Sequence, residues 1–179
     1  MSAKDGTIEP LGVLLADANI LIDLAETNSL GLIGKIIQFG IAKVYVPRTI
    51  YDEVSTLISE TQVAELGLTL LPAQIRLTHE ALGYEDKRLS VPDRVLLLTA
   101  LHNGYAAWTN DKRLRDNCAS HGVKTYWEFE VLKLLVQNDY MSAKELIAVA
   151  ESVESNNIFI KGVAARLREQ LLTSKTERR

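Results

Sequence analysis

Val13-Leu14-Leu15-Ala16-Asp17 is a short apolar run that ends in a carboxylate, and it predicts a buried strand with an acid at its carboxyl end. Four more apolar runs predict strands at residues 43–46, 68–71, 105–108 and 123–126. Helical patterns fall between them, at residues 20–26, 30–39, 48–59, 74–82, 91–103 and 112–121. Alternation of strands and helices favours a parallel sheet with helices on both faces. We therefore expect an α/β fold of three layers, α/β/α, around a central parallel sheet of about five strands.

The chain of 179 residues fits a single domain. We expect a core over about residues 12–138 and a C-terminal helical extension over about residues 139–174. Ser142 and Glu145 have the spacing of a capping box that starts a helix in this extension, and a last helix is expected from about Gly162 to Leu172. Glycines at positions 40, 67, 104 and 122 fall where the earlier helices should end.

The composition, 47% hydrophobic and 24% charged, is typical of a globular protein rather than a disordered one. A net charge of −3 gives no overall basic field, which disfavours a protein that only binds nucleic acid. Cys118 is the only cysteine, which excludes an internal disulfide and a thiolate zinc cluster. The first residues form no apolar signal core, and no run reaches the roughly 20 apolar residues that span a bilayer. We expect a cytoplasmic protein with no membrane partner.

Four carboxylates, Asp17, Glu53, Asp93 and Asp111, lie where such a sheet would present them to one crevice. Asp17 and Asp111 follow predicted strands, whereas Glu53 and Asp93 lie early in predicted helices. In an open parallel sheet, ligands bind beyond the carboxyl ends of the strands, where successive connections leave in opposite directions. If the strands at 13–16 and 105–108 are neighbours at that point, Asp17 and Asp111 face each other across it.

The helix phases support the other two acids. At about 100° per residue, the apolar residues between 50 and 58 place Glu53 at the border of the buried face and Asp52 toward water. Asp93 opens a helix whose next residues, 95–98, are apolar on every side, which indicates an enclosed helix. The positive end of that helix dipole favours an ionised carboxylate.

Grouped carboxylates repel one another and raise each other's pKa unless a cation neutralises them, which favours a hard divalent metal, Mg²⁺ or Mn²⁺. Each acid alone has a structural alternative. Asp17 could form an Asx turn, Asp93 a capping box with Ser90, and Asp111 a helix cap, while Glu53 could be a solvated helix residue. The four together favour metal-dependent phosphodiester chemistry.

Four blocks of the sequence, over about residues 12–138, resemble in order the signature blocks of PIN-domain nucleases. They are Asp17-Ala18-Asn19-Ile20-Leu21-Ile22, Val46-Pro47-Arg48-Thr49-Ile50-Tyr51-Asp52-Glu53-Val54, Asp93-Arg94-Val95-Leu96-Leu97-Leu98 and Trp108-Thr109-Asn110-Asp111. The resemblance implies that Asp17, Glu53, Asp93 and Asp111 are the catalytic acids and hold one or two Mg²⁺ or Mn²⁺ ions.

The resemblance also implies an endoribonuclease that cuts RNA. In many bacterial members this activity is the VapC-like toxin of a type II toxin–antitoxin pair, so an antitoxin protein and a homodimer are expected partners. Asn19 and Thr109 match polar residues that orient the acidic cluster beside the substrate, and Asp116 is a candidate for a further acid. The late helices resemble the extended bacterial PIN branch rather than the shortest toxins, which leaves open a PIN nuclease of RNA processing or defence.

Substrate contacts are expected from Lys112 and Arg113, and also from Arg115, which follow the last acid and could reach flanking phosphates; a solvated helix face is the alternative. The last segment, with basic residues at 161, 166, 168, 175, 178 and 179, could bind RNA or an acidic partner segment; a solvated terminal helix is the alternative. A phosphatase of the haloacid dehalogenase type is disfavoured because Asn19 stands where its second acid is needed. A catalytically silent interaction protein with a PIN fold is the remaining alternative.

Overall fold

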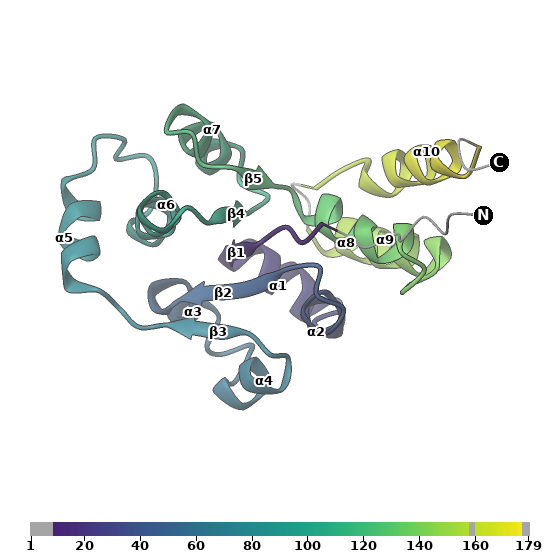
Figure 1. Cartoon of the computed structure of the whole chain (residues 1–179), viewed down its shortest axis with the longest axis horizontal. Helices are drawn as coiled ribbons and strands as arrows, with labels where there is room; N and C mark the ends of the chain where they lie inside the picture. Colours follow the sequence, from purple (N-terminus) through teal and green to yellow (C-terminus); the bar gives the residue numbers. More distant parts are fainter. Residues whose placement is uncertain (1–8, 158–159, 177–179) are drawn as a thin grey trace, which may run out of the picture.

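The expected strands form one parallel sheet (Figure 1). The computed structural model describes residues 9–157 and 160–176, and within them the sheet has five strands in the order β3-β2-β1-β4-β5. The strands are β1 (Val13–Ala16), β2 (Lys43–Pro47), β3 (Thr69–Leu71), β4 (Ala106–Trp108) and β5 (Thr125–Tyr126). Every pairing is parallel, as expected for strands that helices separate in the sequence.

Helices connect these strands and extend beyond them. The connecting helices are α1 (Ala18–Glu26), α2 (Gly31–Gln38), α3 (Arg48–Val54), α4 (Glu60–Glu65), α5 (Ile75–Gly83), α6 (Val91–Asn103) and α7 (Lys112–Ser120). Helices α2 and α3 pack on β2 and α4 packs on β3, whereas α6 packs on β4 and α7 on β5. Figure 1 shows the same division, with α6 and α7 near β4 and β5 and with α4 beside β3. The α/β fold class is therefore confirmed.

The sheet changes its winding direction between β1 and β4. The chain runs from β1 outward to β2 and β3, and then returns to the other side of β1 for β4 and β5. Ala16 is paired with Trp108 in the register of these two strands, and the backbone N–H of Asp17 donates to the carbonyl of Trp108 at 3.0 Å. The segments after β1 and β4 therefore start side by side at the carboxyl edge, which is where open sheets bind ligands.

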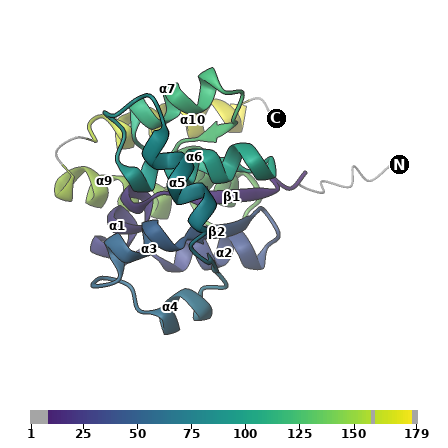
Figure 2. The same cartoon turned by 90° about the vertical axis from the view of Figure 1, so that its left-hand side faces the viewer.

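Helices α3, α5 and α6 lie close to one another near this edge. Helix α5 packs against α6, and α3 packs against both α1 and α6. Figure 2, seen from the side of α5, shows these helices gathered toward the viewer. The arrangement brings the first turn of α6 near the end of α3.

The predicted single helix over residues 48–59 is wrong. Helix α3 ends at Val54, and α4 begins after Ser59, whose side chain accepts a hydrogen bond from the backbone N–H of Gln62 at 3.2 Å. The Gln62 side chain accepts in return from the Ser59 backbone N–H, which completes a capping box. The Tyr51 hydroxyl donates to the carbonyl of Ile58 at 3.0 Å and fixes the turn between the two helices.

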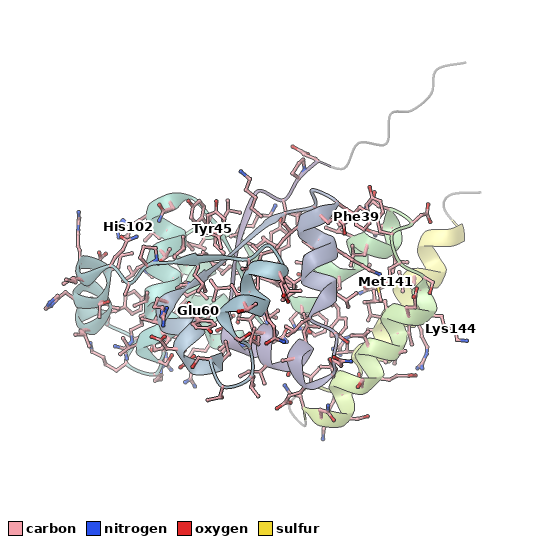
Figure 3. All side chains as sticks on the ribbon, turned by 90° about the horizontal axis from the view of Figure 1, so that it is seen from below. Phe39, Tyr45, Glu60, His102, Met141 and Lys144 are labelled. Atoms are coloured by element: carbon pink, nitrogen blue, oxygen red, sulfur yellow. The ribbon has the colours of Figure 1, made fainter. Side chains whose placement is uncertain are left out.

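The C-terminal helices share the core of the sheet. They are α8 (Glu128–Gln137), α9 (Ala143–Asn156) and α10 (Val163–Thr176), and the predicted capping box of Ser142 and Glu145 starts α9. Helix α9 packs against α10, α1 and α8, and its Leu146, Ala150 and Val153 belong to the main hydrophobic cluster. Figure 3 shows Phe39 and Met141 at the same end of the molecule, where the Phe39 ring stacks on Tyr140 at 3.8 Å between centroids.

Two expectations fall partly outside the described residues. The opening segment, on which the expected cellular location depends, lies in residues 1–8, and the basic residues Arg178 and Arg179 lie beyond residue 176. Of the helices in the described ranges, none has the length and apolar character that crossing a membrane requires.

Candidate functional site

Asp17 is a buried acid at the carboxyl end of β1. Only 2% of it is exposed, and it is the N-cap of α1, where its Oδ1 accepts from the backbone N–H of Ala18 at 2.7 Å. Its other oxygen, Oδ2, accepts from Asn19 Nδ2 and from Thr109 Oγ1, both at 2.5 Å. The Thr109 hydroxyl in turn accepts from the backbone N–H of Asp111 at 3.0 Å. The acid is thus held by residues from both sides of the junction between β1 and β4.

Asn19 and Thr109, the expected orienting residues, lie against Asp17. The Asn19 carbonyl oxygen also accepts from the backbone N–H of Asn110 at 3.1 Å, so one side chain contacts the acid and the loop after β4. Thr109 is fully buried. Their described contacts are with the protein itself, and they fix the direction of the Asp17 carboxylate.

Asp93 lies close enough to two other acids to affect their titration. The pKa of Asp17 is raised to about 6, chiefly by burial and also by the charge of Asp93, although the hydrogen bonds from Thr109, Ala18 and Asn19 oppose the rise. The pKa of Glu53 is also raised, by partial burial of its carboxyl and then by Asp93. Among the described residues, none of these three acids forms a salt bridge. Asp17, Asp93 and Glu53 are therefore an electrostatically coupled group of acids, which we call the acidic cluster.

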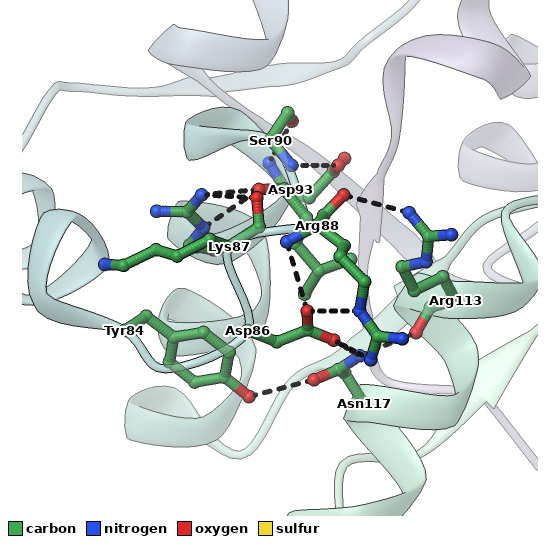
Figure 4. Close-up of polar contacts among 10 residues, drawn as sticks. Tyr84, Asp86, Lys87, Arg88, Ser90, Asp93, Arg113 and Asn117 are labelled. Carbon is green, nitrogen blue, oxygen red and sulfur yellow. Dashed lines mark hydrogen bonds and ion pairs between the residues drawn. The ribbon is translucent and has the colours of Figure 1, made fainter.

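Asp93 also has a local structural role. It is in the first turn of α6, where its Oδ2 accepts from the backbone N–H of Ser90 at 3.0 Å and Ser90 Oγ accepts from the backbone N–H of Asp93 at 3.1 Å (Figure 4). Its neighbour Arg94 is buried and donates to the carbonyls of Leu89 and Ala81, so it is not a partner of the acids. The structural alternative for Asp93, a capping box, is thus present together with its coupling to Asp17 and Glu53.

Asp111 lies in a neighbouring depression rather than in the acidic cluster. It caps α7 by accepting from the backbone N–H of Leu114 at 2.7 Å, and it is exposed. The depression has a volume of about 510 Å³ and is open to solvent. Its walls consist of Arg88, Asp111, Lys112, Arg113, Asp116 and Asn117.

The basic side chains of this depression are already engaged with the protein. Arg113 donates to the carbonyl of Arg88 at 3.1 Å, and the Arg88 guanidinium binds both oxygens of Asp86 (Figure 4). The pKa of the Asp86 carboxyl is lowered by these hydrogen bonds. Lys112 binds Asp116 at 2.7 Å across one helical turn, which gives Asp116 a surface ion pair. Arg115 is not part of the walls of this depression; its guanidinium donates instead to the carbonyls of Thr109 and Asn110.

The carboxylate oxygens of the acidic cluster are suitable ligands for a hard cation, but they are not arranged as a complete coordination site. The acidic cluster offers only carboxylate oxygens, which Mg²⁺ and Mn²⁺ prefer over softer ligands. The charge of Asp93 raises the pKa of Asp17 and of Glu53, and a bound divalent ion would offset that repulsion. Nevertheless, within residues 9–157 and 160–176 no three His, Cys, Asp or Glu side chains are close enough together to hold a metal as placed.

A second buried acidic pair was not expected from the sequence. Asp23 on α1 is 3% exposed and Glu128 at the start of α8 is fully buried. Asn110 Nδ2 donates to both, at 3.1 Å to Asp23 Oδ2 and 2.8 Å to Glu128 Oε2, and Asn157 Nδ2 donates to Asp23 Oδ1 at 2.8 Å. The pKa of Glu128 is raised to about 8, mainly by burial and secondly by the charge of Asp23, despite the hydrogen bond from Asn110 that lowers it. We call Asp23, Asn110, Glu128 and Asn157 the buried network.

One part of the buried network had a detectable signal in the sequence. Asp23 stands three residues after Ile20 and one before Leu24, on the apolar face of α1, so a buried carboxylate could have been inferred there. No local pattern marks Asn157, which lies 134 residues from its partner.

Comparisons with known proteins give little beyond the arrangement of the chain. No protein-family model matches it, and no curated protein matches it. Among solved structures, it is similar to a PilT N-terminus domain protein, SSO1118, from the hyperthermophilic archaeon Sulfolobus solfataricus P2. The two share 10% sequence identity with a TM-score of 0.47, over 68% of this chain and 91% of that chain. A similarity of this extent carries no information on chemistry, which has to come from the side chains themselves.

Proposed function

We propose that this chain is a metal-dependent endoribonuclease that hydrolyses phosphodiester bonds. The observation that carries the proposal is the acidic cluster at the switch point of the sheet. There, burial and Asp93 raise the pKa of Asp17 to about 6, and no described cation pairs with it. Retaining a buried, repelled carboxylate costs stability, and an enzyme that binds a cation there gains function from it.

Asp17, Asp93 and Glu53 are the proposed ligands of Mg²⁺ or Mn²⁺, and Asp111 acts from the adjoining loop. The bound ion would neutralise charge on the phosphoryl oxygens and lower the pKa of a bound water. Asp17 is fixed in direction by Thr109 and Asn19, which favours a constant ligand geometry. Glu53 is exposed, so it can approach substrate or solvent and accept the proton of the attacking water.

The depression beside Asp111 is the proposed binding surface for flanking phosphates. Lys112 and Arg113 line it, and each keeps N–H groups beyond those used by Asp116 and the Arg88 carbonyl. Phosphate contacts of this kind hold a strand in position without reading its sequence. Single-stranded RNA is the proposed substrate, and a toxin role, an antitoxin partner and a homodimer follow only from the sequence resemblance.

A catalytically silent interaction protein is the second candidate. It is favoured by the absence, among the described residues, of three potential ligands already close enough to hold a metal. In that case the acids would act only as the helix caps and capping box that Asp17, Asp93 and Asp111 form.

Cleavage of labelled RNA separates the two candidates. The wild-type protein, Asp17→Asn and the control Asp139→Asn, a change at an exposed acid in the turn after α8, are each incubated with a single-stranded RNA and with DNA of the same sequence, in Mg²⁺, in Mn²⁺ and in EDTA. We expect metal-dependent RNA cleavage by the wild type and by Asp139→Asn, and none by Asp17→Asn. Cleavage that persists in EDTA or in Asp17→Asn would contradict the proposal, and no cleavage in any metal would favour the silent protein. Arrest of growth on induced expression, lost in Asp17→Asn, would support the toxin role.

A further inference from the structure

The loop after β4 is fixed from three directions. The backbone N–H of Asn110 donates to Asn19 Oδ1, and that of Asp111 donates to Thr109 Oγ1. The carbonyls of Thr109 and Asn110 accept from Arg115 at 3.1 and 2.7 Å. The third contact comes from the Asn110 side chain, which donates to Asp23 and Glu128 of the buried network.

The Asn110 amide uses both of its ends in the buried network. Its Nδ2 donates to Asp23 and Glu128, and its Oδ1 accepts from the backbone N–H of Glu128 at 3.3 Å. One side chain therefore joins the loop to α1 and to the first turn of α8. A hydrophobic replacement of similar size would leave two buried carboxyls without their shared donor, which is costly.

The buried network reaches the C-terminal helices. Asn157 directly follows α9 and donates to the second oxygen of Asp23, so α9 is connected through Asp23 to Asn110. Glu128 Oε1 is buried with no hydrogen-bond partner among the described residues, so the network is not saturated. A fully buried carboxyl that keeps an unpartnered oxygen stabilises the fold poorly, and this argues for a role other than stability.

We propose that Asn110 is a positioning residue, through which the buried network and α9 hold the loop that carries Thr109 and Asp111 in register with Asp17. This inference rests on the proposed function, because it assigns the loop to a reaction. In this proposal the C-terminal helices contribute to the geometry of the site, because α9 contacts Asp23 through Asn157 and Asp23 contacts Asn110 in the loop beside Asp17.

Amide hydrogen exchange tests the coupling without any need for activity. In Glu128→Leu, exchange at the Asn110 and Asp111 amides should accelerate by about tenfold or more, while amides of the distant strand β3 keep their protection. Glu128→Gln keeps an acceptor for Asn110 and should exchange like the wild type. Asn157→Ala is the milder variant, because Asn157 lies at the edge of the network, and it should accelerate exchange at the same amides by a smaller factor. The control is Asn138→Ala, because the Asn138 side chain donates to the Leu134 carbonyl of the preceding helix α8 and, among the described residues, has no bond to the buried network.

Cleavage kinetics then connect the coupling to the site. The variants that loosen the loop should lose about tenfold or more in kcat with KM for RNA within about twofold, because small misplacements of reacting groups cost rate before they cost binding. A uniform loss of protection across the sheet, or unchanged exchange at Asn110 in both Glu128→Leu and Asn157→Ala, would overturn the positioning role. If the wild type cleaves no RNA, the proposed function fails, while the exchange data still decide whether the buried network holds the loop.

Discussion

Replacing Asp17 by asparagine should stabilise the metal-free protein near neutral pH. The side chain is buried, and its pKa is raised from 3.8 to about 6, so the folded state resists ionisation of a group that the unfolded state ionises freely. A group of this kind contributes its stability below the unfolded pKa and loses it as pH rises through the folded pKa. Asparagine has nearly the same shape and carries no charge.

The size of the effect follows from the shift. About two pKa units at 1.36 kcal/mol each amount to roughly 3 kcal/mol of cost carried by the ionised acid at neutral pH. The asparagine amide cannot accept from both the Ala18 side and the Thr109 side, so part of this gain is lost. That loss does not depend on pH, so the advantage of the variant should shrink by about 2 kcal/mol between pH 7.5 and pH 4.

Urea unfolding in EDTA at several pH values measures this difference directly. Asp116→Asn is the matched control, because Asp116 has an exposed ion pair with Lys112 and its loss should change stability by no more than about 1 kcal/mol. Added Mg²⁺ should stabilise the wild type and remove the advantage of Asp17→Asn. A variant that is destabilised by the same amount at pH 4 and at pH 7.5 would refute the claim that Asp17 is held against its own charge.

Three further outcomes are expected. The wild type should lose stability as pH rises from about 4.5 to about 8, because the folded state resists ionisation of Glu128, and the loss should reach about 3 kcal/mol near pH 7. Glu128→Gln should lack this loss, and identical pH profiles of the two proteins in urea unfolding would count against it. Lys112→Ala and Arg113→Ala should each weaken RNA binding and reduce the salt slope by about one, measured by fluorescence anisotropy, and an unchanged slope would exclude phosphate contact. Glu53→Gln should weaken Mn²⁺ binding in titration calorimetry while leaving the unfolding midpoint nearly unchanged, since its side chain is exposed; undiminished Mn²⁺ affinity would remove it from the ligand set.

The strands and the meeting of β1 with β4 could be predicted because both depend on short apolar runs and on chain connectivity. Residues 13–16 form β1 as predicted, and Asp17 and Thr109 meet because Ala16 is paired with Trp108. The split between α3 and α4 was missed because the apolar spacing continues through Ile58, whereas the capping box at Ser59 starts a new helix. Apolar spacing alone predicts one continuous helix at this point, whereas the capping residues determine where the second helix begins.

The candidate site could be predicted only in part. Asp93 lies close enough to Asp17 and to Glu53 to raise the pKa of both, but among the described residues no three acids converge as the predicted metal site requires. Asp111 follows the structural alternative that its sequence position allowed, because its carboxylate turns toward its own helix and accepts from the backbone N–H of Leu114. The buried network depends on a side chain that follows α9, and contacts across so much sequence leave no local pattern.

The most direct test of the central claim is a crystal of the wild-type protein soaked in Mn²⁺, with the metal located by its anomalous scattering. We expect an anomalous peak between the carboxylates of Asp17, Asp93 and Glu53. A Mn²⁺ peak elsewhere on the molecule, or none between these acids when Mn²⁺ is abundant, would contradict a metal-dependent nuclease built on this cluster.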